Sequence, residues 1–162
     1  MSIKKIITGL ALLILLSSGI AVASDFNKGI DAYQSGDFKT ALAEFTPLAG
    51  QGHVGAQLKL ALMYYSGEGV LSNNKIAVIW YTKAAEQGDA HAQGLLAFHY
   101  LEGEGVEKDT KRSYMWLDLA AYNGNKDAKD AKGFIAETMT PSQITKAEEM
   151  SSRCLNSGYT DC

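Results

Sequence analysis

Few side chains in this sequence have the types and spacing that chemistry needs. Ser72 and Lys75 form a Ser-x-x-Lys pair, the arrangement that places a nucleophile beside a lysine in β-lactamases. Those enzymes also need Ser-Asp-Asn and Lys-Thr-Gly elements, and neither occurs here. The same pattern occurs at Ser2 and Lys5, which shows how easily it arises. We therefore expect Ser72 to cap a helix, and we assign no catalytic residue.

Metal and phosphate sites are equally hard to place. His91 and His99 lie on one predicted helix about 12 Å apart, which is too far for a shared metal ion. His53 stands at a predicted helix start. The Gly-Glu-Gly-Val segments 67–70 and 103–106 follow helices, and each puts a carboxylate where a phosphate needs neutral or positive groups. We expect turns at these segments, packing or solvated histidines, no metal and no cofactor.

The N-terminal segment has the pattern of an export signal. Lys4 and Lys5 precede an uncharged run over 6–20, and a small-residue segment ends at Ala23. This order is typical of a secretory signal peptide, residues 1–23, that is cleaved after Ala23. The run is shorter than the roughly 20 residues of a spanning helix, so we expect no stable membrane insertion after cleavage. An uncleaved membrane tether is the alternative. We predict a periplasmic or secreted protein with one folded domain, residues 24–162.

The net negative charge of the chain restricts the kinds of partner that it can bind. The whole chain has a net charge of −3, and loss of Lys4 and Lys5 makes the remainder −5. Nucleic acid and anionic lipid are bound mainly by clustered lysine and arginine, and the sequence has no such cluster. We expect neither to be a partner.

The two cysteines, Cys154 and Cys162, lie close to the C-terminal end. In an oxidising compartment such a pair persists as a disulfide. On one straight helix their backbones would be about 12 Å apart, beyond the roughly 7 Å limit for bridging, so the chain must turn between them. Residues 156–158 supply that turn. We predict a disulfide worth about 2 to 3 kcal/mol; zinc binding or redox catalysis is the alternative.

An internal repeat organises the predicted helices. Residues 53–88 align without a gap on residues 89–124. Each unit contains two stretches with the apolar spacing of a helix, and the Gly-x-Gly-Val turn ends the first of them. A degenerate unit at 26–52 precedes them, with a tight turn at Gly36 and Asp37.

A closing helix pair follows at 125–155, with a disulfide-bearing tail at 156–162. Thr140, Pro141 and Gln143 predict a capping box at the start of the last helix. The two full repeats share apolar and glycine positions, which in the first of them are Ala56, Gln57, Leu60, Ala61, Met63, Tyr64, Gly67, Gly69, Val70, Ala77, Trp80, Tyr81, Lys83, Ala84, Ala85 and Gly88.

On these residues the sequence resembles the Sel-1-like repeat family, relatives of tetratricopeptide repeats. The resemblance implies an all-α fold, a right-handed α-solenoid of about four antiparallel helix pairs. It also implies a role in assembling or regulating protein complexes, often in the bacterial envelope. Lys132 and Gly133 replace leucine and alanine of the earlier units, so we expect the last pair to pack differently. We expect Trp80 and Trp116 at equivalent buried positions.

On the first helix of each full repeat, a stripe of side chains at a spacing of three and four does not belong to the apolar positions that the repeats share. In such solenoids the first helices line the concave side, so this stripe is the candidate binding surface for a protein or peptide partner. The alternative is that its apolar members pack against a neighbouring helix or a second copy of the chain. The predicted partner-binding residues are Lys59, Leu62, Tyr65, Leu95, Phe98 and Glu102.

The sequence therefore favours a non-catalytic scaffold or regulator in the bacterial envelope, monomeric or weakly self-associating. Two alternatives remain. One is a secreted factor that contacts a host protein, because the same signal peptide serves both destinations. The other is a hydrolase acting on β-lactams, because some exported, cysteine-rich members of the family carry that description.

Overall fold

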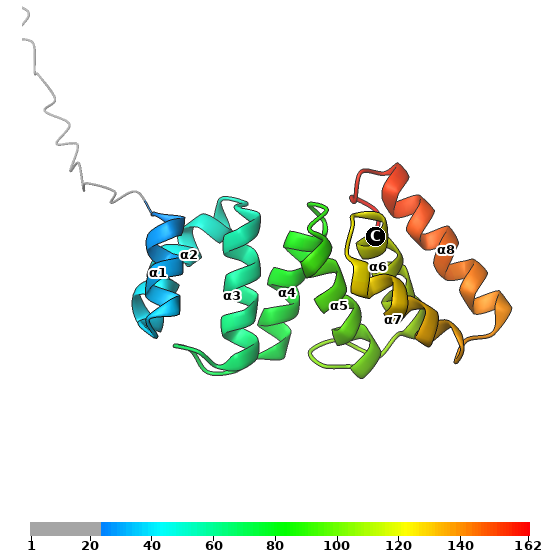
Figure 1. Cartoon of the computed structure of the whole chain (residues 1–162), viewed down its shortest axis with the longest axis horizontal. Helices are drawn as coiled ribbons and strands as arrows, with labels where there is room; N and C mark the ends of the chain where they lie inside the picture. The colour runs from blue at the N-terminus through cyan, green and yellow to red at the C-terminus, as the bar shows by residue number, and fades with distance from the viewer. Residues whose placement is uncertain (1–23) are drawn as a thin grey trace, which may run out of the picture.

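The computed structural model describes residues 24–162, so the predicted signal peptide lies outside the described residues. The described part consists of helices and contains no strand (Figure 1). The helices are α1 Phe26–Gln34, α2 Phe38–Gly50, α3 Val54–Ser66, α4 Asn74–Ala85, α5 Ala90–Glu102, α6 Thr110–Tyr122, α7 Lys126–Ala136 and α8 Pro141–Asn156. Within residues 24–162 no helix combines the length and apolar character needed to cross a bilayer.

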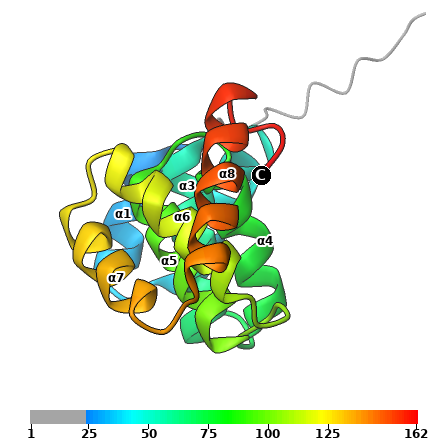
Figure 2. The same cartoon turned by 90° about the vertical axis from the view of Figure 1, so that its right-hand side faces the viewer.

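The helices follow one another as four pairs in sequence order, and the first three are packed antiparallel pairs. We call α1, α3, α5 and α7 the first helices and the others the second helices. Each first helix packs against its own second helix and, from α3 on, against the second helix of the preceding pair. The exception is the last pair, in which α7 and α8 both pack against α6 (Figure 2). This arrangement confirms the predicted all-α solenoid.

Polar side chains begin the helices where the sequence predicts caps. The predicted capping box is present, with Thr140 and Gln143 bonding to each other's backbone. Ser72 does not cap α4, because that helix begins at Asn74 and its N-cap is Asn73. The Ser72 hydroxyl instead donates to the carbonyl of Tyr65 at 3.0 Å, in the last turn of α3. The capping expectation for Ser72 was therefore wrong.

The core is a continuous layer of small and aromatic side chains between the helices. One cluster spans α1 to α4 and a larger one spans α3 to α8, and the side chains of Tyr64 and Trp80 pack against both. Trp116 is buried, whereas Trp80 is only half-buried. The difference follows from the ending of the stack, because α6 also packs against α8, while α4 packs mainly against α3 and α5.

A buried glutamine joins each full repeat to the pair before it. The Gln57 amide donates to the carbonyl of Ala49 at 3.1 Å, and one repeat later the Gln93 amide donates to Ala85 at 3.0 Å. Both acceptors lie in the last turn of the preceding second helix, where carbonyls lack a partner within the helix. These bonds explain why glutamine recurs at the start of the first helices.

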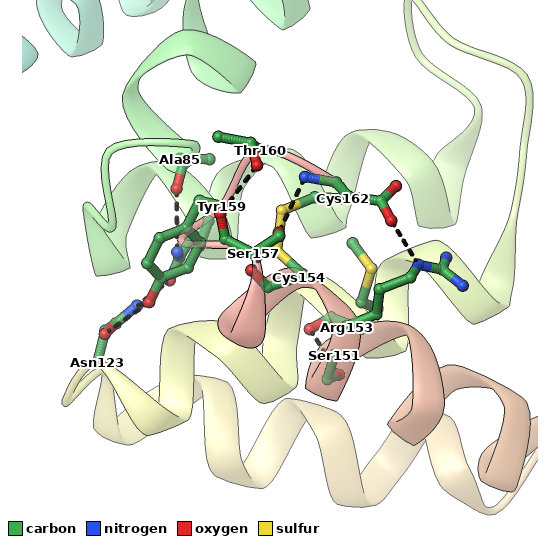
Figure 3. Close-up of a disulfide and its surroundings, with 12 residues drawn as sticks. Ala85, Asn123, Ser151, Arg153, Cys154, Ser157, Tyr159, Thr160 and Cys162 are labelled. Atoms are coloured by element: carbon green, nitrogen blue, oxygen red, sulfur yellow. Dashed lines mark hydrogen bonds and ion pairs between the residues drawn. A yellow bond between two sulfur atoms is a disulfide. The ribbon is translucent and has the colours of Figure 1, made fainter.

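The C-terminal tail folds back on the stack (Figure 3). Cys154 and Cys162 form a disulfide with Cα atoms 4.6 Å apart, as predicted. The turn between them places Tyr159 at φ 66°, a left-handed conformation that is uncommon for a bulky side chain. The Tyr159 hydroxyl donates to Asn123 at 3.1 Å, and Asn123 donates to the buried Gln93 at 2.9 Å. The tail is therefore tied to α6 and α5.

The second glycine of each Gly-x-Gly-Val turn allows close contact with the preceding pair. A Cβ atom on Gly69 would lie 2.7 Å from Cβ of Phe38, and one on Gly105 would lie 2.4 Å from the carbonyl oxygen of Asn74. Phe38 and Asn74 are the first residues of α2 and α4. The turn of each repeat thus rests on the start of the second helix one pair earlier.

Aromatic rings fill the space between α3 and α5. The ring of His99 lies 5.3 Å from the ring of Tyr65 and 5.3 Å from the ring of Tyr81, measured between centroids. His99 is buried, and its Nδ1 lies 2.9 Å from the carbonyl oxygen of Glu104. Burial lowers the pKa of the His99 imidazole below its usual value of 6.5. The folded protein therefore holds this side chain neutral.

We predict that Gly105→Ala destabilises the protein more than Gly36→Ala does. Both glycines have φ near 80°, so each alanine costs about 1–2 kcal/mol for the left-handed conformation. Gly36 has open space around its Cβ position, whereas Gly105 faces the Asn74 backbone. Chemical denaturation should show the larger loss for Gly105→Ala. Equal losses would contradict the close contact between the turn and α4.

We predict that the free energy of unfolding decreases as the pH is lowered, because the His99 side chain protonates more readily in the unfolded chain. Because its folded pKa is lowered, the unfolded chain binds the proton first, and stability decreases as pH drops below about 6.5. His99→Met, which copies Met63 of the preceding repeat, should reduce this slope in denaturation experiments between pH 7.5 and 5. An unchanged slope would show that His99 does not carry the effect.

Candidate partner-binding groove

The structure places the predicted stripe on α3 and α5. Some of its side chains are exposed to solvent and others are half-buried. Tyr65 is 38% exposed and Phe98 is 43% exposed. Glu102 is also exposed, whereas Leu62 and Leu95 are half-buried and pack against the larger core cluster. Leu62 therefore serves packing, whereas Leu95 packs against the core and also lines a hollow beside α7. Phe98 is the most exposed large apolar side chain of the stripe.

Lys59, the basic member of the stripe, already interacts with residues of the protein. Its ammonium lies 5.1 Å from the centroid of the Tyr33 ring, which is a cation–π contact. The Tyr33 hydroxyl donates to the Glu68 carboxylate at 2.6 Å, and this bond raises the pKa of Tyr33 to about 12. The N-terminal part of the stripe thus has its polar groups partnered within the chain.

An apolar pocket lies between α5 and α7, which are neighbours in both views (Figure 1, Figure 2). Its volume is about 180 Å³, and its walls include Phe98, Leu101, Phe134 and Ile135. A second hollow of about 230 Å³ continues from it toward Asp127. The two share the residues Gly94, Leu117 and Ala131. We call the combined feature the α5–α7 groove.

Three differences between the repeats open this groove. Gly94 stands where the preceding repeat has Leu58, Leu101 where it has Tyr65, and Leu117 where it has Tyr81. Each change puts a smaller side chain beside α7. Between α3 and α5 the larger residues are present, and Tyr65 and Tyr81 fill the space together with His99. The groove is therefore a specific property of the second full repeat.

Phe134 is the main groove residue that the sequence prediction missed. It is 71% exposed and stands one repeat length after Phe98, which in turn follows Leu62. Extending the repeat offset into the closing helix pair would have found it. Ser113 and Leu117 were missed because the prediction considered only the first helices.

The groove has little charge. Asp127 is the charged residue among the groove-lining side chains, and within residues 24–162 it forms no ion pair. The described residues hold no group of three or more metal-ligating side chains. Ser72 and Lys75 are both exposed and lie outside the groove. Its chemistry suits apolar contact.

Comparison with known proteins agrees with this architecture. The Sel1 repeat model matches residues 54–89 and 90–125. The crystal structure of c5321, a protective antigen of uropathogenic Escherichia coli with an SLR fold, aligns with a TM-score of 0.76 and 28% identity over 82% of this chain. A Sel1 repeat protein from Oxalobacter formigenes aligns with a TM-score of 0.66 and 32% identity over 68% of this chain.

The chain spans only part of these proteins, 30% of the first and 46% of the second. A search of curated proteins finds no match. The repeats, the helix pairs and the structural neighbours agree with the repeats and the fold that the resemblance in the sequence implies. The chain belongs to the Sel1 repeat family.

Proposed function

We propose that this protein is a non-catalytic scaffold that binds a segment of a protein partner along the α5–α7 groove. The Sel1 repeat fold suggests a protein–protein interaction scaffold, and members of the family are typically non-catalytic. The observation that carries the proposal is the pair of exposed phenylalanines, Phe98 and Phe134, which border an apolar pocket. Exposed apolar patches with concave shape are typical of binding surfaces.

The rigidity of the stack supports tight binding by a small surface. The groove walls belong to α5, α6 and α7, in which α6 packs against both of the others, and hydrogen bonds of Gln93 link α5 to α4 and to Asn123 at the end of α6. A partner segment that enters a preformed groove loses its own freedom but does not have to order the receptor. Aromatic side chains that bury much area with few rotatable bonds then carry much of the affinity.

We further propose that the protein acts in the bacterial envelope after cleavage at Ala23, as the signal pattern in the sequence indicates. The Cys154–Cys162 disulfide supports an oxidising compartment. A secreted factor that contacts a host protein remains the alternative, and fractionation of periplasm and medium separates the two.

We predict that Phe98→Asp with Phe134→Asp weakens partner binding by about 30-fold or more, the scale of an interface hot spot. The partner is first isolated by affinity purification with the wild-type protein and identified, and then its affinity for each variant is measured by calorimetry. Leu71→Asp is the matched control, because Leu71 is 92% exposed in a loop outside the groove. Circular dichroism checks that all variants fold. Unaltered affinity in the folded double variant would rule out this groove as the binding surface.

A further inference from the structure

The floor of the groove carries a buried hydroxyl without a partner. Ser113 lines the apolar pocket, its side chain is 0% exposed, and its Oγ has no hydrogen-bond partner in the described part of the chain. A buried polar group of this kind is costly and calls for an explanation. Ala77 occupies the same position one repeat earlier, so neither the helix nor its packing requires a hydroxyl here.

The size of the pocket sets the size of its occupant. An apolar cavity of roughly 150 Å³ in another protein holds benzene, so a pocket of about 180 Å³ suits one six-membered ring. Phe98 and Phe134 offer ring faces and edges for an aromatic neighbour. A phenol ring also brings a hydroxyl group, which can satisfy Ser113 Oγ as donor or acceptor. Among protein side chains, tyrosine meets both requirements.

The charge at the other end of the groove indicates which side chain the partner segment carries near its tyrosine. Asp127 is exposed, lines the second hollow and has no ion-pair partner within residues 24–162. Asp127 and Phe134 are separated by about 10 Å along α7. An extended peptide advances about 3.3 Å per residue, so a side chain about three positions from the ring reaches this carboxylate. Complementarity then calls for lysine or arginine at that position.

We propose that the α5–α7 groove binds a partner segment that places a tyrosine ring in the apolar pocket, against Ser113, and a basic side chain about three residues away at Asp127. This inference rests on the proposed function and specifies the chemistry of the segment. The segment belongs to another protein, because the groove joins an apolar end to an unpaired negative charge that a mixed peptide sequence can match.

The first test uses p-cresol and toluene as probes of the pocket. Their binding is measured from changes in the NMR chemical shifts of the purified protein. Because a neutral hydrogen bond contributes modestly, p-cresol should bind about five-fold more tightly than toluene. Ser113→Ala, which copies Ala77, should remove this preference while toluene still binds. Leu117→Tyr, which copies Tyr81, should abolish binding of both probes by filling the pocket. If Leu117→Tyr does not fold, Leu101→Tyr replaces it as the variant that fills the pocket, because Leu101 is only half-buried.

Equal affinity of the wild-type protein for both probes would overturn the role of Ser113. Binding that survives both tyrosine variants would overturn the pocket itself. A wild-type dimer in sedimentation equilibrium that dissociates in Leu101→Tyr would overturn the peptide occupant and assign the groove to a second copy of the chain.

The second test uses two acetylated, amidated peptides, Gly-Tyr-Gly-Gly-Lys-Gly and Gly-Tyr-Gly-Gly-Glu-Gly. The lysine peptide should bind about two- to five-fold more tightly, the range of an exposed ion pair, and Asp127→Asn should remove the difference. No difference between the peptides would refute the basic side chain. If both peptides fail while Phe98→Asp with Phe134→Asp still loses the natural partner, this inference fails and the proposed function stands. If the peptides bind to the wild-type protein but the Phe98→Asp, Phe134→Asp variant still binds the natural partner, the proposed function fails instead.

Discussion

A pair of short helices cannot bury its apolar face alone, and this constraint determines the rest of the structure. Each pair presents small residues such as Ala56, Ala84 and Ala92, which are fully buried only because the neighbouring pair covers them. The apolar clusters accordingly run through the whole stack and are joined at Trp80 and Tyr64. Stability in such an array arises from the interfaces between pairs as much as from the pairs themselves.

The same repeat explains why one groove is open. Identical spacing brings equivalent positions of successive repeats to equivalent places, so a smaller residue in one repeat leaves a hollow that the other repeat fills. Leu117 in place of Tyr81 and Gly94 in place of Leu58 are the clearest cases. The closing pair then supplies α7 as the opposite wall, with Phe134 at its rim. The groove that we propose as the binding surface thus arises from departures from the repeat.

Much of the fold was predictable because its signals are local. The capping box at Thr140 and the left-handed glycine at Gly67 depend on nearby residues, and the structure contains both. The disulfide was predictable because only two cysteines are present. The candidate site was less predictable, because Leu62 has the same helical spacing as Leu95 and Phe98 but packs against the core, and the sequence does not place the helices that cover it. Burial of Ser113 likewise depends on three helices meeting.

If the helix pairs fold only as a stack, a peptide spanning residues 53–88 cannot fold alone, and its far-ultraviolet circular dichroism measures this. We expect a largely unfolded peptide, because its helices are short and its apolar face has no cover. The whole domain should be strongly helical under the same conditions. A monomeric peptide with the full helical signal and a cooperative melting transition would show that one helix pair folds without its neighbours.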